Sequence, residues 1–315
     1  MGVGLSFLIG LKAAVLFSLF AFLRSSGFTV LSIPFLYASL VSALVSLAAH
    51  PSIDLPILLG KNPDGSFPVW SIIMFSPYLY FVRFFSALRR LRSREAPYTE
   101  ICEGLFVGGW PSSPDKLPPG DPAIVDCTCE LPRKPEFSGH SYLCLPTWDT
   151  RAPPPAAIES AVKWACRKRD QNRPVFVHCA YDKKRGMEYM QKAFLNFVTL
   201  LFVKQIPRNH FLSELFSFTG RNIQTLGPAV INKSSQLLSS STSIGQCPLP
   251  NTMFDGHGRS VAVMCALLVA LGVAEDWKNA EKLIREKRPY IRMNALHRMA
   301  LEEWSKHRLS PSKKN

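Results

Sequence analysis

Acidic residues are scarce in this chain, and so is any pattern typical of nucleic-acid binding. The 315 residues include 23 Asp and Glu against 37 Lys and Arg, so the net charge is +14 and the isoelectric point is near 9.6. This excess favours anionic partners such as lipid headgroups or phosphorylated substrates. No stripe of basic residues is interleaved with aromatic ones, however, and we therefore expect no nucleic-acid partner.

Metal-binding motifs are missing as well. The eight cysteines form no CxxC pairs, and no HxxxH pair accompanies them, although zinc sites usually show such spacings. Most of these cysteines are therefore expected to be small buried side chains in a reducing compartment.

Charge is absent from residues 28–49 and nearly absent from residues 3–23, where Lys12 is the one charged residue. Both apolar runs reach the ~20 residues that a helix needs to cross a bilayer. The first run lacks the basic start of a signal sequence, and the second follows it at once. A third run, residues 67–85, is rich in aromatic residues, contains two prolines and Arg83, and is either a third span or an interfacial segment.

A cluster of arginines after the third run sets the expected topology. It consists of Arg89, Arg90, Arg92 and Arg94. The positive-inside rule places this cluster and the chain after it in the cytosol. The loop between the second and third runs holds Lys61 against Asp54 and Asp64, which is consistent with the opposite side. We therefore predict a multi-pass membrane protein with a membrane anchor over residues 1–94, two or three transmembrane helices and a basic juxtamembrane end.

The chain after about residue 97 has the pattern of a soluble α/β domain. Four short strands are expected at residues 104–109, 123–128, 141–146 and 174–179. Four helices are expected at residues 154–170, 259–272, 274–289 and 293–308. The helix over residues 259–272 is almost wholly apolar, so it should be buried and closed by Gly272. Residues 309–315 form a tail that is expected to be disordered.

Cys179 stands where a nucleophile would be activated. A free thiol has a pKa of about 8.5, but a cysteine between a strand and the start of a helix is surrounded by backbone N–H groups that favour the thiolate. The same ring of donors suits a phosphate dianion. An arginine at the end of such a loop would grip two phosphate oxygens with its planar guanidinium group.

Two separated stretches together make such a loop. The residues "HCAY" end at Tyr181, and "GHGRS" begins at Gly256; joined, they place five residues between Cys179 and Arg259, followed by Ser260. The joined loop resembles the signature of the Cys-based protein tyrosine phosphatases, and of their dual-specificity branch in particular. The expected phosphate-binding residues are Ala180, Tyr181, Gly256, His257, Gly258, Arg259 and Ser260.

The resemblance covers residues 97–181 and 256–308 and implies a fold and a chemistry. The fold would be α/β, with a dual-specificity-phosphatase-like central sheet flanked by helices after the membrane helices. Cys179 would form a phosphocysteine intermediate, Arg259 would bind phosphate, and Ser260 would help to stabilise the thiolate as it leaves.

Asp149 is the expected general acid. It lies thirty residues before Cys179, on a proline-flanked loop after a predicted strand, in "LPTWDTRAPP". A carboxylic acid on such a loop can protonate a leaving oxygen and later activate water. The alternative is a purely structural role for Asp149 in a turn or as a helix N-cap. Cys179, Asp149 and Arg259 suffice for the chemistry, so no metal and no organic cofactor is implied.

An interruption separates the two halves of the loop. The 74 residues from Asp182 to Asp255 intervene, so the predicted phosphatase domain comprises residues 95–181 plus 256–308, and residues 182–255 are an insertion. Two interpretations stay open, a retained intron translated in frame and a genuine regulatory insertion. Arg185 offers an alternative arginine at the same spacing from Cys179. Asp182 would then aim a negative charge into a site for a dianion.

The functional hypotheses follow from this loop. The first is a phosphatase that hydrolyses phosphate monoesters, namely phosphotyrosine and phosphoserine or phosphothreonine in proteins. An alternative is a phosphoinositide or phosphatidylglycerophosphate-type lipid phosphatase, and another is a catalytically impaired phosphatase fold that binds phosphorylated partners. The expected partners are thus a phosphorylated protein or lipid substrate and the membrane bilayer.

Overall fold

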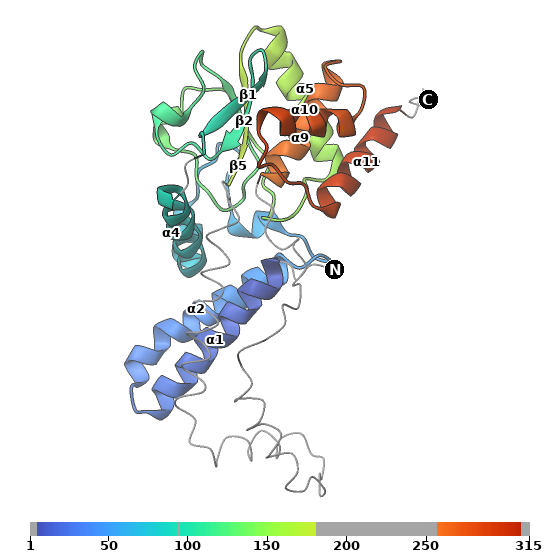
Figure 1. The fold of residues 1–315 in the computed structure, drawn as a ribbon. Coiled ribbons are helices and arrows are strands. Elements are labelled where there is room, and N and C mark those ends of the chain that lie inside the picture. Colours follow the sequence, from blue (N-terminus) through green and yellow to red (C-terminus); the bar gives the residue numbers. More distant parts are fainter. Residues whose placement is uncertain (1–4, 93–94, 181–256, 310–315) are drawn as a thin grey trace, which may run out of the picture. The chain divides into compact units, whose positions relative to one another are not determined.

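The computed structural model describes residues 5–92, 95–180 and 257–309 of the chain (Figure 1). The chain divides into two compact units, Met1–Gly186 together with Thr252–Asn315, and Met187–Asn251. The second unit lies outside the described residues, as do the side chains of the arginine cluster at residues 89–94.

Two long apolar helices open the described chain. They are α1 (Leu5–Ser25) and α2 (Thr29–Ala48), and each is long and apolar enough to cross a membrane. The helices pack side by side as a hairpin, because the Ser39 hydroxyl donates to the carbonyl of Ala13 at 2.8 Å and the Ser46 hydroxyl donates to that of Ser6 at 2.6 Å. In the part of the chain that the structure describes, these two helices alone meet the length and composition of a span.

The third apolar run is broken into two helices, α3 (Val69–Met74) and α4 (Ser76–Arg92). Pro77 accounts for the break, since its ring would clash with the Ile73 carbonyl in a continuous helix and it has no N–H to donate. The Tyr37 hydroxyl donates to that carbonyl at 2.7 Å and to the Met74 carbonyl at 2.8 Å. The freed carbonyls therefore keep hydrogen-bond partners despite the break.

A five-stranded sheet and its helices follow. The strands are β1 (Tyr98–Cys102), β2 (Leu105–Gly109), β3 (Ala123–Asp126), β4 (Tyr142–Cys144) and β5 (Val175–Cys179). The helices are α5 (Pro155–Asp170), α9 (Gly258–Ala270), α10 (Trp277–Lys287) and α11 (Ala295–Leu309), and short 3-10 turns are η1 (Pro56–Leu59), η2 (Pro114–Lys116) and η3 (Pro135–Phe137). The order is β1-β2-β5-β3-β4, with β1 antiparallel to β2 and the other neighbours parallel.

Most of these elements confirm the sequence-based predictions. Four strands and the four helices lie where the hydrophobic patterns placed them, whereas β1 has no counterpart among the predicted strands. Helix α9 is buried from Gly258 to Leu268, as its apolar sequence predicted. Gly272 follows it with a left-handed φ of 71°, a conformation that glycine adopts readily.

The two faces of the sheet carry different side chains, because successive residues of a strand point to opposite sides. Val125 and Val177 belong to the apolar core that also contains α5, α9, α10 and α11, and Figure 1 shows these helices grouped together. Asp126 and His178 are the next residues on their strands and are paired in register. They therefore lie on the face away from α9.

The loop after α2 supplies the partner of Asp126 on that second face. The Lys61 ammonium donates to the Asp126 carboxylate at 2.7 Å and to the Thr128 carbonyl at 2.7 Å, and both side chains of the ion pair are buried. Tyr142 donates to the same carboxylate at 2.6 Å. The expectation that this loop lies across the membrane from the soluble domain is therefore wrong. The net charge of the loop did not reveal its position, because Lys61 is paired with a carboxylate of the domain.

Replacing Lys61 tests this buried ion pair. Lys61→Met would leave the Asp126 carboxylate buried without its cation, so we expect the free energy of unfolding to fall by about 3–5 kcal/mol. Denaturant unfolding of the full chain in detergent micelles would measure the loss. Lys163→Met is the matched control, because Lys163 is largely exposed and its pairing with Glu159 is worth about 0–1 kcal/mol. Equal losses in the two variants would contradict a structural role for Lys61.

Candidate active site

Two parts of the chain that are far apart in sequence meet at Cys179. This residue ends β5, and its Sγ lies 3.2 Å from the Ser260 hydroxyl in the first turn of α9. The structure thus brings the described residues of the two halves, which end at Ala180 and begin again at His257, together through Cys179 and Ser260. Tyr181, Gly256 and Arg185 lie outside the described residues.

The surroundings of Cys179 favour a thiolate. Burial by itself raises the pKa of the Cys179 thiol, but a hydrogen bond and the charge of His257, the charge of Arg259 and a hydrogen bond from Ser260 outweigh it, so the pKa lies below its ordinary value. Burial likewise lowers the pKa of His257, yet hydrogen bonds with Cys179 and Glu95 reverse that effect and raise it. A negative charge on the Cys179 sulfur and a positive charge on the His257 imidazole therefore stabilise each other.

Arg259 is buried beside the thiol and is already paired. Its two terminal nitrogens contact the two oxygens of Glu130 at 3.1 and 2.8 Å, in a fork-to-fork arrangement. Nη1 also donates to the Thr147 carbonyl at 2.7 Å, and Nη2 lies 3.3 Å from the Asp149 carboxylate. The guanidinium group thus joins the loops after β3 and β4 to the start of α9.

The loop that carries Asp149 is held on both sides of that residue. Trp148 is fully buried and meets Tyr78 of α4 edge to face, with ring centroids 6.4 Å apart. On the other side, the Asn294 amide donates to the Thr150 carbonyl at 2.8 Å. The Asp149 side chain itself is partly exposed and lies beside Arg259, whereas its two neighbours are fixed.

Gly258 is required by the helix that follows. A Cβ atom at this position would lie 2.5 Å from Cε1 of His297, a buried ring that Asn294 holds through a 2.6 Å contact to Nδ1. Burial, and after it the charge of Arg259, lowers the pKa of His297 to about 4, so the ring is neutral near pH 7. The glycine lets the first turn of α9 approach this neutral ring closely.

A group of buried polar side chains lies on the opposite face of the sheet from Cys179. His178, next to Cys179, is buried, and burial lowers its pKa to about 4 although Asp126 opposes the shift. Burial would raise the pKa of Asp126, but Lys61, His178 and Tyr142 hold it far below its ordinary value. The carboxylate therefore stays ionised and Lys61 supplies its main positive partner.

Several residues of this site were not among the sequence-based candidates. Glu130, Trp148 and Asn294 contact the candidate residues or adjoin them. Lys61, which precedes the first strand in the sequence, contacts Asp126 on the opposite face of the sheet. One signal was present for Glu130, because "DCTCE" places Asp126 at the end of a buried strand and Glu130 four residues later. Asn294 and Lys61 had none, since their partners are more than sixty residues away.

The folded chain is similar to solved structures of phosphatases of the dual-specificity and protein-tyrosine type. Tk-PTP in its active form matches at 15% identity and a TM-score of 0.39, over 67% of this chain and 97% of its own. Human DUSP28 matches at 12% identity and a TM-score of 0.39, over 68% of this chain and 95% of its own. PTPMT1 in complex with PI(5)P matches at 14% identity and a TM-score of 0.38, over 67% of this chain and 96% of its own. No protein-family model and no curated protein matches the chain. These are distant similarities of fold.

Alkylation of Cys179 across a pH series tests its lowered pKa. Because the thiolate is the reactive form, a lowered pKa moves the midpoint of the rate against pH below the value of about 8.5 for a free thiol. Iodoacetamide labelling followed by peptide mass spectrometry gives this midpoint for each cysteine separately. Ser260→Ala should move the Cys179 midpoint upward, because it removes a hydrogen bond to the thiolate.

Cys166 provides the internal control for this series. Burial is the main cause that raises its pKa, so its midpoint should lie above that of a free thiol in the same sample. A Cys179 midpoint equal to or above that of Cys166 would contradict the activated thiolate.

Proposed function

We propose that the protein is a membrane-anchored phosphatase that hydrolyses phosphate monoesters through a phosphocysteine intermediate at Cys179. The observation that carries this proposal is the arrangement of a buried, pKa-lowered thiol at the end of β5, in contact with the first turn of α9 and beside a buried guanidinium group. Sulfur nucleophile, helix N-terminus and arginine together suit a tetrahedral dianion.

In the first step the Cys179 thiolate attacks phosphorus. An S–P bond forms while the bond between phosphorus and the ester oxygen breaks, and the electron pair leaves with that oxygen. Asp149, in its protonated form, donates a proton to the leaving oxygen, so that a neutral alcohol or phenol departs. Arg259 and the N–H groups at the start of α9 stabilise the negative charge on the phosphoryl oxygens.

In the second step water replaces the sulfur. Asp149, now a carboxylate, accepts a proton from a water molecule whose oxygen attacks the phosphorus. The S–P bond breaks, inorganic phosphate departs and the electron pair returns to Cys179. The Ser260 hydroxyl, 3.2 Å from Sγ, donates a hydrogen bond to the thiolate as it is released.

Phosphate binding changes the partners of Arg259. Nη2 contacts Asp149 at 3.3 Å, whereas Glu130 contacts both terminal nitrogens at 2.8 and 3.1 Å. A phosphate group would displace the longer contact and leave the fork to Glu130 in place. Asp149 would then be free to approach the leaving oxygen, and Glu130 acts as a positioning residue for the guanidinium group.

The membrane anchor is the second part of the proposal. Helices α1 and α2 have the length and composition of spans. The loop that carries Asp149, here called the acid loop, lies against the end of α2, because Arg151 donates to the carbonyl of Ala49 at 3.4 Å. Ala49 caps α2. The active site would therefore lie close to the bilayer surface, on the cytosolic side that the arginine cluster predicts.

Two substrate classes fit this site. Phosphorylated tyrosine, serine or threonine in proteins is the first candidate. The contact between the acid loop and the end of α2 favours a second, a lipid phosphate monoester, since a headgroup in the same bilayer would lie near the site without leaving its membrane.

Assay of the purified full chain on p-nitrophenyl phosphate tests the chemistry. A variant lacking residues 182–255 is the matched comparison. Turnover should be lost with Cys179→Ser, and Arg259→Ala should lower kcat/KM by about a hundredfold or more, because it removes stabilisation of the phosphoryl charge. Arg185→Ala should leave the rate near that of the unaltered chain.

The outcomes separate the open interpretations. Activity that depends on Arg185 and not on Arg259 would overturn the assignment of the arginine. Activity confined to the deletion variant would mean that the insertion disrupts the enzyme. Absence of turnover in both, with binding of a phosphopeptide retained, would instead indicate a phosphate-binding fold without catalysis.

A competition between substrates tests the second candidate. The full chain in phosphatidylcholine vesicles would be given a phosphoinositide in the same vesicles or a soluble phosphotyrosine peptide. If membrane proximity supplies the substrate, transfer to detergent micelles should lower the phosphoinositide rate much more than the peptide rate. Equal changes for both would favour the protein substrate.

A further inference from the structure

We propose that residues 67–84 form a re-entrant membrane surface, which enters the bilayer from the side of the catalytic domain and returns to that side. Its partner is the acyl-chain region of the lipid bilayer. This inference rests on the membrane anchor proposed above but not on the phosphatase chemistry. It replaces the third transmembrane span that the sequence left open.

The first argument is that both ends of the segment contact one domain. On the near side Lys61 contacts Asp126, and the backbone N–H of Arg133 donates to the carbonyl of Gly65 at 2.8 Å. On the far side Arg288 donates to the carbonyl of Ala96 at 3.1 Å. The hydrocarbon core is about 30 Å thick, so a segment that crossed it once could not return to the same domain.

The second argument is that the turn between α3 and α4 contacts the middle of the α1–α2 hairpin. Tyr37, which bonds to the end of α3, lies eleven residues before the end of α2, or about 17 Å along its axis. Lys12, seven residues into α1, donates to the carbonyl of Pro77 at 3.3 Å and lies 4.0 Å from the centre of the Phe81 ring. The segment therefore reaches inside the ends of both candidate spans.

These contacts also account for Lys12, the single charge of the first apolar run. An unpaired ammonium group inside a bilayer is costly. Here the carbonyl of Pro77, which lies at the break between α3 and α4, accepts a hydrogen bond from it, and the face of Phe81 provides a cation–π contact. Non-helical backbone at membrane depth is tolerated where it meets protein in this way.

The third argument is that the segment has two apolar faces with different surroundings. One face is buried: Phe75 and Leu79 join the cluster that contains Trp148 of the acid loop. The other face is exposed, with Val69 at 72%, Trp70 at 54% and Ile73 at 66% of their full exposure. Large exposed apolar surfaces mark contact with a partner, and continuity with the apolar helices identifies lipid as that partner.

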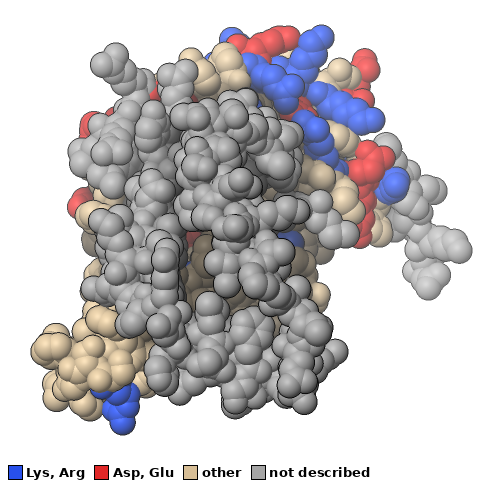
Figure 2. Space-filling model, turned by 60° about the horizontal axis from the view of Figure 1, so that its bottom comes forward, with Lys and Arg blue, Asp and Glu red and all other residues tan. Residues whose placement is uncertain are grey.

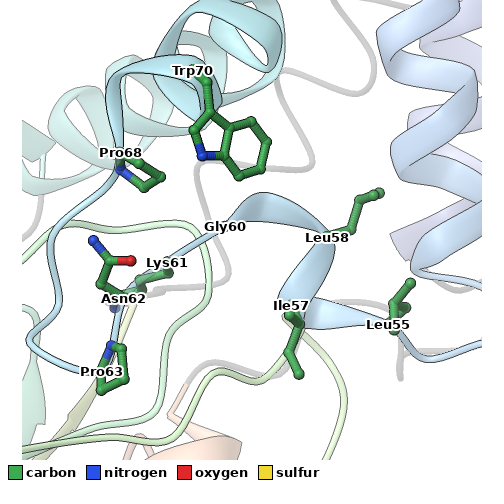
Figure 3. Close-up of a pocket in the computed structure, with 9 residues that line it drawn as sticks. All are labelled: Leu55, Ile57, Leu58, Gly60, Lys61, Asn62, Pro63, Pro68 and Trp70. Carbon is green, nitrogen blue, oxygen red and sulfur yellow. The ribbon is translucent and has the colours of Figure 1, made fainter.

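A hollow beside this surface is also largely apolar. It measures about 590 Å³ and lies between the loop after α2 and the start of α3. Figure 3 shows Pro68 and Trp70 on one side of it and Ile57 and Leu58 on the other. Its largely apolar lining suits acyl chains. Figure 2 shows Lys, Arg, Asp and Glu side chains gathered at its upper right.

The topology follows from these contacts. The loop after α2 and the start of α1 lie on the side of the catalytic domain, and the turn between α1 and α2 lies on the opposite side. Because Tyr78 of the segment packs against Trp148, the segment itself supports the loop that carries Asp149. The N-terminal segment is then part of the active-site framework as well as an anchor.

Labelling of introduced cysteines tests the topology. Ser52→Cys, Ser26→Cys and Glu303→Cys would be made singly in the full chain, in sealed phosphatidylcholine vesicles with the domain outside. A membrane-impermeant maleimide should label Ser52→Cys to the same extent as Glu303→Cys, and should label Ser26→Cys only after detergent is added. Peptide mass spectrometry separates each introduced cysteine from the native ones. Protection of Ser52→Cys with labelling of Ser26→Cys is the pattern that three spans would give, and it would overturn the re-entrant path.

Fluorescence quenching tests the lipid contact. Vesicles that contain phosphatidylcholine with brominated acyl chains should quench the tryptophan emission of the full chain, and Trp70→Phe should remove part of that quenching. Trp164→Phe is the matched control, since Trp164 is half-buried on α5 of the domain and should leave the quenching unchanged. Identical quenching in the two variants would overturn the lipid-facing surface.

Neither readout depends on turnover, so loss of activity would not affect them. Release of the protein from vesicles by alkaline washing would refute the anchor itself. Retention with an unlabelled Ser52→Cys would refute only the re-entrant path.

Discussion

The fork between Arg259 and Glu130 is the interaction on which the rest of the site depends. Both side chains are buried, so each charge relies on the other for the stabilisation that water would otherwise provide. Through the additional contacts of the guanidinium group with Thr147 and Asp149, one residue holds the loops after β3 and β4 against the start of α9. Removal of either partner would leave a buried charge, which is why this pair constrains the geometry so strongly.

That constraint has consequences on both faces of the sheet. On one face, α9 brings Ser260 to Cys179, and the absence of a side chain on Gly258 lets the helix approach His297. On the other face, Lys61 neutralises Asp126 beneath His178. The loop after α2 therefore completes the domain from a part of the chain that precedes it, and the acid loop is packed against α4. The N-terminal helices and the candidate site thus share a framework of contacts.

Local patterns predicted much of this structure. The alternating and helical periodicities located four strands and four helices, and the apolar composition of α9 predicted its burial. The two halves of the Cys179 loop were visible as motifs, because residue types and spacing within each half carry the chemistry. β1 was missed, since its mixed sequence "YTEIC" shows little apolar alternation and it owes its place to pairing with β2. Glu130 and Asn294 were missed because they acquire a role only through partners distant in sequence.

The sequence by itself determined the existence of two long apolar helices, an α/β domain and a cysteine followed, after an interruption, by an arginine and a serine. These depend on periodicity, hydrophobicity and residue chemistry, which are local properties. Tertiary structure alone decided which carboxylate holds Arg259, which lysine holds Asp126, and where the third apolar run is broken into two helices. Those outcomes depend on which groups meet when the chain is buried, and a buried charge must find a partner wherever in the sequence that partner lies.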